Sequence, residues 1–394
     1  MDRLVGAFSS QTRSTARLRI AQLAPLYERV PPQLYGGTER VVSYLTEELV
    51  RRGHEVTLFA SGDSKTSGRL KAGCPRALRL HGGVETAAAL QLPMLTDAYA
   101  GGFDVVHSHL DYWTFPFAEL KPEQATVCTM HGRLDVPSLH PIYRHYRRTP
   151  LVSISHAQRA PLPGMNWAAT IYHGLPLDSL RFNARGGEYL AFVGRISFEK
   201  RPDIAIEVAR RAGIPFKLAA KVDAVDREYF EAVIKPRLAP PDVEYIGEIN
   251  EHEKSEFLGN ALALLFTIDW PEPFGLAMIE ALACGTPVIT RRCGSTPEIV
   301  RSGHNGFIAN SVDELVAAVH RAAGLSREAC RRDFEERFSI ARMADNYERL
   351  YERLIAQIAQ RDNEDRVSVA GEAEEEAGVE IAKAAALSAG TESG

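Results

Sequence analysis

The stretch DWPEPFGLAMIEALACGTPV, residues 269–288, decides how the rest of the chain is interpreted. It follows an apolar run, ALALLFTI (residues 261–268), which is short enough and rich enough in β-forming residues to be a buried strand. The Pro-Glu-Pro turn ends that strand, because proline cannot donate to the ladder. A helix then begins near Phe274 and Gly275, has apolar residues at helical spacing, and ends at Gly285. The stretch therefore predicts a strand, a tight turn and a well-packed helix.

Two carboxylates accompany the start of this predicted helix, Glu272 just before it and Glu280 within it. Backbone N–H groups at a helix start attract phosphate. A carboxylate further along the helix can accept two hydrogen bonds from the vicinal hydroxyls of a ribose. Phosphate donors together with a diol acceptor predict a nucleotide site. Two other readings of the pair stay open: ordinary helix carboxylates, one favoured by the helix dipole, or the acid pair of a glycosidase.

A second candidate cluster lies at another predicted strand-to-helix turn, where Arg195 and Lys200 are five positions apart. Two cations held at a helix start can neutralise a diphosphate, the arginine through two parallel hydrogen bonds and the lysine as a point charge. If the diphosphate is a leaving group, these charges oppose the negative charge that develops on it. A solvated pair of cations beside Glu199 is the alternative.

Repeated strand–turn–helix units predict two doubly wound, Rossmann-like α/β domains that face each other across a cleft. The first series begins with a strand at residues 18–24 and a helix that follows Gly36 and Gly37, and such βαβ units form parallel sheets. The second series begins at Tyr189, after an aperiodic segment that marks the domain boundary. The predicted parts are a disordered lead (1–17), the first domain (18–185), the second domain (186–338), a last helix (339–360) and a disordered acidic tail (361–394).

Composition fits a protein without nucleic acid as a partner. Of the 394 residues, 45% are hydrophobic and 25% charged, and the formal charge is −5. The acidic tail has a net charge of −6, so the rest of the chain is nearly neutral, unlike a nucleic-acid binder. The five cysteines lack paired short spacing, and no apolar run approaches the roughly 18 residues of a membrane span. We therefore expect a cytoplasmic protein with at most peripheral membrane contact.

Histidines follow two of the predicted strands. His107 and His109, with Asp111 close by, could resemble a metal site, but no second ligand cluster completes it, and we expect no metal. His131 ends another strand beside Gly132 and could face the cleft. A purely structural histidine is the alternative for His131.

Taken together, these stretches resemble the retaining glycosyltransferases of family 4, two-domain nucleotide-sugar transferases of GT-B architecture. The resemblance extends over residues 18–354, and its motifs occur in the family's order and spacing. The matching segments are YGGTERVV (35–42), TMHG (129–132), FVGRISFEKRPD (192–203), EPFGLAMIEALACGTPV (272–288) and GSTPEIVRSGHNGFI (294–308). One loop departs from the pattern, because many relatives have Pro-Asn-Gly where this chain has Tyr172-His173-Gly174.

The resemblance implies a donor-binding role for residues of the second domain. Arg195 and Lys200 would bind the donor diphosphate, with help from the backbone at Phe274, Gly275 and Leu276.

The hydroxyl groups of the donor would have other partners. Glu280 would hold the ribose, and Glu272 would contact the donor sugar near the reacting carbon. His131 would lie over that sugar, and Gly36 and Gly37 would approach the phosphate and the acceptor. The base would be recognised by backbone between Gly247 and Ile249. The residues expected to act in catalysis are His131, Glu272, Arg195 and Lys200.

The implied reaction is transfer of a sugar from a nucleoside-diphosphate sugar to a hydroxyl acceptor, which could be a glycan, a lipid or a small molecule. The favoured picture is a front-face displacement that retains the anomeric configuration, without a protein nucleophile, a metal or another cofactor. Catalysis would then depend on positioning and on stabilisation of the leaving group. Alternative functions are a nucleotide-sugar epimerase of the same architecture, a glycan phosphorylase with pyridoxal phosphate, or a non-catalytic nucleotide-binding module.

Overall fold

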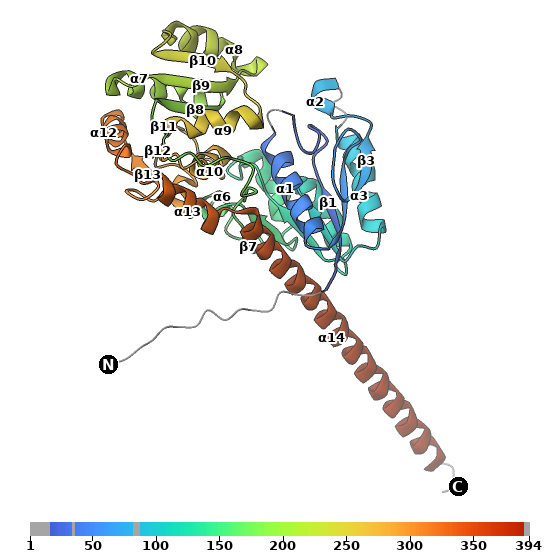
Figure 1. The fold of residues 1–394 in the computed structure, drawn as a ribbon. Coiled ribbons are helices and arrows are strands. Elements are labelled where there is room, and N and C mark those ends of the chain that lie inside the picture. The colour runs from blue at the N-terminus through green and yellow to red at the C-terminus, as the bar shows by residue number, and fades with distance from the viewer. Residues whose placement is uncertain (1–15, 34–35, 82–86, 390–394) are drawn as a thin grey trace, which may run out of the picture.

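The structure, a computed structural model, describes residues 16–33, 36–81 and 87–389. It contains two parallel β-sheets, one in each half of the chain, and a long C-terminal helix that projects away from both (Figure 1). The predicted fold class of two doubly wound α/β domains is confirmed. Residues 1–15, most of the predicted lead, lie outside the described part of the chain.

The first sheet has seven parallel strands in the order β3-β2-β1-β4-β5-β6-β7. Its strands are β1 (Arg19–Leu23), β2 (Glu55–Ser61), β3 (Arg69–Cys74), β4 (Val105–Ser108), β5 (Thr126–Thr129), β6 (Leu151–Ser153) and β7 (Trp167–Thr170). The helices of this half are α1 (Gly37–Arg51), α2 (Leu78–His81), α3 (Ala87–Ala100), α4 (Phe115–Leu120), α5 (His140–His145) and α6 (His156–Arg159).

Helices cover both faces of this sheet, as the alternating side chains of β1 show. Ile20 packs in one cluster with Leu45 of α1, whereas Leu23 packs in another with Leu95 of α3. Successive residues of a strand point to opposite faces, so a strand covered on both sides is largely apolar. The edge strand β3 (RLKAGC) was not predicted, because its mixed composition carries no strand periodicity.

The second sheet has six parallel strands in the order β10-β9-β8-β11-β12-β13. Its strands are β8 (Tyr189–Arg195), β9 (Phe216–Lys221), β10 (Val243–Gly247), β11 (Ala261–Phe266), β12 (Val288–Arg291) and β13 (Gly306–Ala309). The helices are α7 (Pro202–Ala212), α8 (Arg227–Tyr229), α9 (Glu251–Gly259), α10 (Leu276–Ala283), α11 (Thr296–Ile299), α12 (Val312–Ala322) and α13 (Arg327–Arg337). The quoted stretch thus forms the turn after β11, helix α10 and the start of β12. Strand β13, only four residues long, was not predicted.

The last helix, α14 (Ile340–Ala389), leaves the second domain and packs on the first. Its residues Met343, Tyr347, Leu350 and Tyr351 are buried in the same cluster as Ile20. Beyond this contact the helix continues through most of the acidic segment (Figure 1), where the sequence predicted disorder. Alanine and glutamate, which are frequent there, favour helix, and extension of an existing helix needs no new nucleus.

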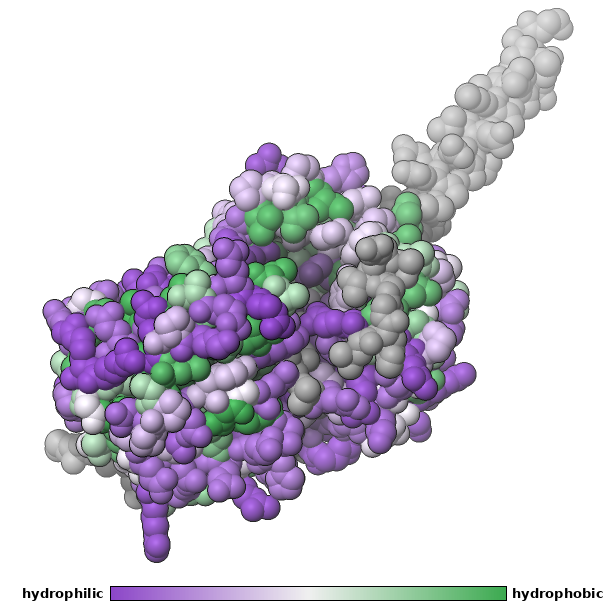
Figure 2. Space-filling model, turned by 90° about the horizontal axis from the view of Figure 1, so that it is seen from above, coloured by the Kyte–Doolittle hydropathy of each residue, from purple (hydrophilic) through white to green (hydrophobic). Residues whose placement is uncertain are grey.

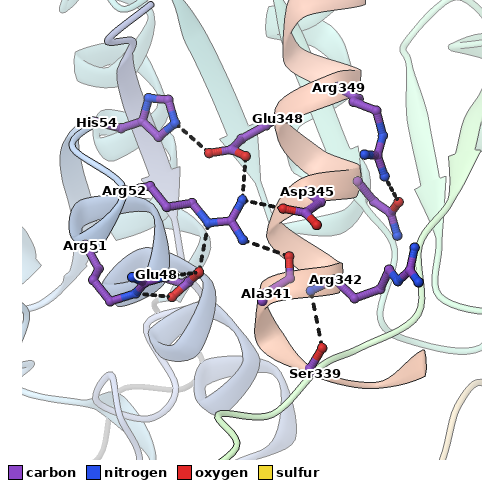
Figure 3. Close-up of polar contacts among 11 residues, drawn as sticks. Glu48, Arg51, Arg52, His54, Ser339, Ala341, Arg342, Asp345, Glu348 and Arg349 are labelled. Carbon is purple, nitrogen blue, oxygen red and sulfur yellow. Dashed lines mark hydrogen bonds and ion pairs between the residues drawn. The ribbon is translucent and has the colours of Figure 1, made fainter. Parts of the chain in front are cut away.

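A buried arginine fastens α14 to the first domain (Figure 3). The guanidinium of Arg52, only 7% exposed, follows the end of α1 and points at the first turns of α14. It bonds to Glu48 at 2.8 Å and to Asp345 and Glu348 at 2.6 Å each. It also donates to the carbonyl oxygen of Ala341 at 2.8 Å. One planar cation therefore joins two helices that are almost 300 residues apart in the sequence.

In the described part of the chain, every helix is either too short or too polar to cross a bilayer. Figure 2 shows a mostly hydrophilic face on which apolar residues are scattered among polar ones.

We expect Arg52→Ala to lower the free energy of unfolding by about 2–3 kcal/mol, because it leaves partly buried carboxylates without their shared cation. The matched control is Arg51→Ala, because Arg51 bonds to the same Glu48 but its side chain is 67% exposed. That change should cost less than about 1 kcal/mol. Urea titration followed by circular dichroism measures both, and equal losses would contradict the anchoring role of Arg52.

The same cluster should make the fold sensitive to acid. Burial alone raises the pKa of Glu48 and Glu348, but hydrogen bonds from the neighbouring arginines and from His54 outweigh it and hold each pKa below the usual 4.5. A carboxylate with a lowered pKa contributes stability above its unfolded pKa and loses it as the pH falls through the folded value. The wild type should therefore lose stability below about pH 4.5 more steeply than Arg52→Ala. Parallel curves for the two proteins would refute this.

Candidate active site

Two helices begin at the same place, one from each domain. Gly36 precedes α1 and Gly275 precedes α10, and neither helix has a side-chain cap. A side chain on Gly37 would lie 3.4 Å from Leu276 of α10, so the two helix starts meet. The backbone N–H groups of the first turns, and both helix dipoles, therefore favour an anion at this point.

Glycine at position 275 is required by the backbone and by space. Its φ is +85°, in the left-handed region, and a Cβ there would come within 2.7 Å of the Met278 side chain and 3.0 Å of the Phe266 ring. The tight turn brings the backbone of Leu276 to the surface that faces the first domain.

Lys200 and Glu272 form an ion pair beside the start of α10. The indole N–H of Trp270 donates to the same Oε2 atom of Glu272 at 3.0 Å. The Lys200 ammonium also lies 4.9 Å from the centre of the Trp270 ring. Glu272 is only 8% exposed, so this pair and the indole hold its carboxylate in one orientation.

Arg195 is surrounded by carboxylates. Its guanidinium lies 3.0 Å from Glu199, 3.3 Å from Asp226 and 3.8 Å from Asp223. Burial raises the pKa of Asp226 in spite of the nearby arginine. The aspartates follow β9, and only the pairing of β9 with β8 brings them to Arg195. A diphosphate would have to compete with these groups for the guanidinium.

Glu280 is almost fully buried and is paired with a lysine that the sequence did not single out. Lys254 of α9 bonds to Glu280 at 2.8 Å and lies 3.4 Å from Glu251. Glu251 in turn pairs with Arg40 of α1 at 2.5 Å. Burial by itself would lower the pKa of Arg40. The nearby carboxylate of Glu251 outweighs burial and raises that pKa above its usual value. Four alternating charges thus connect the ribose-binding candidate to the first domain.

His131 lies at the end of β5, half-buried among other histidines. It hydrogen-bonds His109 at 2.8 Å, and its ring stacks on His173 with 5.2 Å between the ring centres. His173 contacts Phe274 of the second domain at 4.9 Å. Burial lowers the pKa of His131 to about 3, so the ring is neutral at pH 7. The structure therefore places His131 within two side chains of the start of α10.

The ring of Phe274 is buried against residues of both domains. Its ring is 2% exposed and packs among His173, Tyr172 and Phe338. The ring thus supports the histidine cluster and has almost no surface left for a ligand.

At the predicted base-binding segment, Gly247 has a φ of +82° with open space beside it, and Ile249 is half-buried.

The structure gives His107 and His109 hydrogen-bond partners within the fold. His107 bonds to Thr129 and Tyr351, and His109 bonds to Gln22 and His131. Within the described residues, no group of three histidine, cysteine or acidic side chains is placed to hold a metal ion.

Contacts across the domain boundary bring further residues to the site. The guanidinium of Arg133 lies 5.5 Å over the ring of Trp270. Glu298 accepts hydrogen bonds from the backbone N–H groups of His156 and Ala157, both at 2.8 Å, and from the hydroxyl of Tyr172 at 2.9 Å. Sequence reasoning missed Arg133 and Trp270 as a pair, although Trp270 stands two positions before Glu272.

Two family models match the chain. "Glycosyltransferase Family 4" matches residues 35–172, and "Glycosyl transferases group 1" matches residues 181–337. The chain is 27% identical over 361 residues to D-inositol 3-phosphate glycosyltransferase of Mycolicibacterium paratuberculosis, which covers 74% of this chain and 78% of that protein. The enzyme of the same name from Mycobacterium leprae is 27% identical over 374 residues, with 75% and 83% covered.

Solved structures of glycosyltransferases have the same fold. AviGT4, a glycosyltransferase involved in avilamycin A biosynthesis, matches with a TM-score of 0.69 and 25% identity over 86% of this chain and 98% of that one. The sucrose-phosphate synthase of Thermosynechococcus elongatus matches with a TM-score of 0.71 and 19% identity, covering 86% and 100%. Anabaena HepE in complex with UDP-glucose matches with a TM-score of 0.65 and 15% identity, covering 88% and 100%.

Gly294 lies behind Glu272, and its replacement should disturb that carboxylate. It has a φ of +53°, and a Cβ there would come within 2.4 Å of the backbone N and O atoms of Glu272. We expect Gly294→Ala to lower the free energy of unfolding by about 3 kcal/mol, from backbone strain plus this clash. The matched control is Gly303→Ala, where φ is +82° but nothing lies within 4 Å, so that only the strain of about 1 kcal/mol applies. Denaturant titration distinguishes the two, and equal losses would show that Gly294 is not packed on Glu272.

Proposed function

Because the chain belongs to the group 1 glycosyltransferases of family 4, we propose that it transfers a sugar from a nucleoside-diphosphate sugar to a hydroxyl acceptor with retention of the anomeric configuration. The observation that carries the proposal is the meeting of two uncapped helix starts beside Lys200 and the buried acids Glu272 and Glu280. This arrangement offers groups for the phosphates, the ribose and the sugar of one ligand. HepE, a structural neighbour, binds UDP-glucose, which supports a donor of this class.

The donor would bind by exchange of partners. Its diphosphate would take Lys200 and Arg195 from their present carboxylates, with the first turns of α1 and α10 as further donors. Glu272, released from Lys200 but still bonded to Trp270, would accept hydrogen bonds from the hydroxyls of the donor sugar. Glu280, oriented by Lys254, would accept those of the ribose. Each buried charge would then keep a partner throughout binding.

Bond cleavage would depend on stabilisation of the leaving group. As the bond between sugar and phosphate breaks, negative charge accumulates on the diphosphate, where the cations and the helix starts already point. The acceptor hydroxyl would attack on the face that the diphosphate leaves, and a phosphate oxygen would take its proton. His131, neutral at pH 7, would contact the sugar without adding charge. This route needs no protein nucleophile and no metal, and chelation with EDTA should leave turnover unchanged.

A panel of UDP-, GDP- and ADP-sugars tests the reaction class. We expect one donor to raise the melting temperature by mass action and to be hydrolysed slowly without acceptor. D-inositol 3-phosphate is the first acceptor to test, since relatives are named for it, and NMR of the product would report the anomeric configuration. Interconversion of nucleotide sugars would instead identify an epimerase, and binding without turnover a non-catalytic module.

The variants Glu280→Ala and Lys200→Ala should each weaken donor binding by at least about tenfold, because each removes charge-assisted hydrogen bonds to the ligand. Suitable controls in the same domain are Glu207→Ala and Lys235→Ala, whose side chains are 51% and 58% exposed. Isothermal titration with the donor from the panel measures the effect. Unchanged affinity in both site variants would refute this assignment of the donor site.

A further inference from the structure

A continuous chain of hydrogen bonds runs through the core of the first domain and ends at His131. It connects three neighbouring strands with the last helix, and most of its members are fully buried. The members are Gln22 of β1, His107 and His109 at β4, Thr129 and His131 at β5, and Tyr347 and Tyr351 of α14.

The end of the chain that reaches the site has a defined direction. The Oε1 atom of Gln22 can only accept, so the Nε2 atom of His109, 2.9 Å away, carries the proton and donates it. The other nitrogen of a neutral His109, Nδ1, is then an acceptor. It lies 2.8 Å from Nε2 of His131, which must therefore be the protonated nitrogen of that ring.

The opposite end of the chain is oriented by α14. The amide nitrogen of Gln22 donates to Nδ1 of His107 at 3.2 Å and to the hydroxyl of Tyr351 at 3.4 Å. Tyr351 in turn donates to the same Nδ1 atom at 2.7 Å. His107 is left with its proton on Nε2, which donates to Thr129 at 2.8 Å.

This directional scheme requires that the histidines be neutral. Burial lowers the pKa of His107 and His109 well below the usual value and that of His131 to about 3. Thr129 completes the scheme, because its hydroxyl accepts from His107 and can donate to Tyr347 at 2.9 Å. The side-chain nitrogen and oxygen atoms of Gln22, His107, His109 and Thr129 each have a partner of the required kind.

We propose that Gln22 and His109, oriented by Tyr351, are positioning residues that hold His131 as the tautomer protonated on Nε2. The Nδ1 atom of His131 then keeps a lone pair, and it bonds to no group within the described residues. In the proposed function, on which this last step rests, Nδ1 accepts a hydrogen bond from a hydroxyl of the ligand. The helix that returns from the second domain would thereby set the hydrogen-bonding polarity of the site.

The proposal is tested by NMR of the full chain labelled with ¹⁵N-histidine. We expect the His131 signals, identified by their loss in His131→Asn, to show a protonated Nε2 and an unprotonated Nδ1. If the protein itself sets the tautomer, the His131 signals must be the same with and without nucleotide sugar. A protonated Nδ1, or an equal mixture of tautomers in the wild type, would overturn the proposal.

Two variants test the assigned residues. His109→Phe removes the acceptor, and Tyr351→Phe removes one of the two acceptors that orient the Gln22 amide. Both should give mixed tautomers of His131. The matched control is Tyr99→Phe, which removes a buried hydroxyl that bonds to Thr126 at 3.0 Å, outside this chain. Tyr351→Phe differs from wild type by one atom, so it remains informative if His109→Phe does not fold. An unchanged His131 pattern in Tyr351→Phe would refute the role of α14.

Kinetics supply a second readout. We expect Tyr351→Phe to lower kcat by about fivefold, the value of one buried hydrogen bond, with Tyr99→Phe at the wild-type rate. The NMR result does not depend on turnover. If the wild type shows the Nε2–H pattern of His131 but no transferase activity, only the proposed function is rejected. If it is active but His131 carries its proton on Nδ1, only the positioning role is rejected.

Discussion

Glu272 and Glu280 are carboxylates that the fold has taken almost completely out of water, and this constraint shapes the site around them. A buried charge without a partner is costly, so each acid needs a cation or hydrogen-bond donors beside it at all times. In the ligand-free protein those cations are Lys200 and Lys254. The pairing keeps the acids oriented before a ligand arrives. Preorganisation of this kind lowers the reorganisation that binding requires.

The two domains are tied together by helix α14. Its tyrosines fill the core of the first domain, and Arg52 fixes its first turns to α1. Without α14, the cluster around Ile20 would lose several of its largest side chains. The chain therefore builds its first domain from residues at both ends of the sequence. The same helix also reaches the polar groups behind His131, so stability and site geometry depend on one element.

Much of the fold could be predicted because its signals are local. The apolar run before Asp269, the proline turn and the helix up to Gly285 each depend on neighbouring residues, and the structure forms them as β11, the turn and α10. Strands β3 and β13 were missed because short or mixed segments become strands only by pairing with a neighbour. The tail beyond residue 361 was expected to be disordered from its charge, but helix propensity and the preceding helix extend α14 through it.

The sequence by itself determined the two α/β series and the glycines that begin α1 and α10, and it singled out two acids and two cations as candidates for the site. Only the tertiary structure decided which of these groups touch. It paired Lys200 with Glu272, enclosed Arg195 in three carboxylates and gave Glu280 a lysine from α9. It also buried the ring of Phe274 and joined His131 to Tyr351 through a chain of side chains. Such contacts bring together residues from distant strands and helices, and no local pattern of residues specifies them.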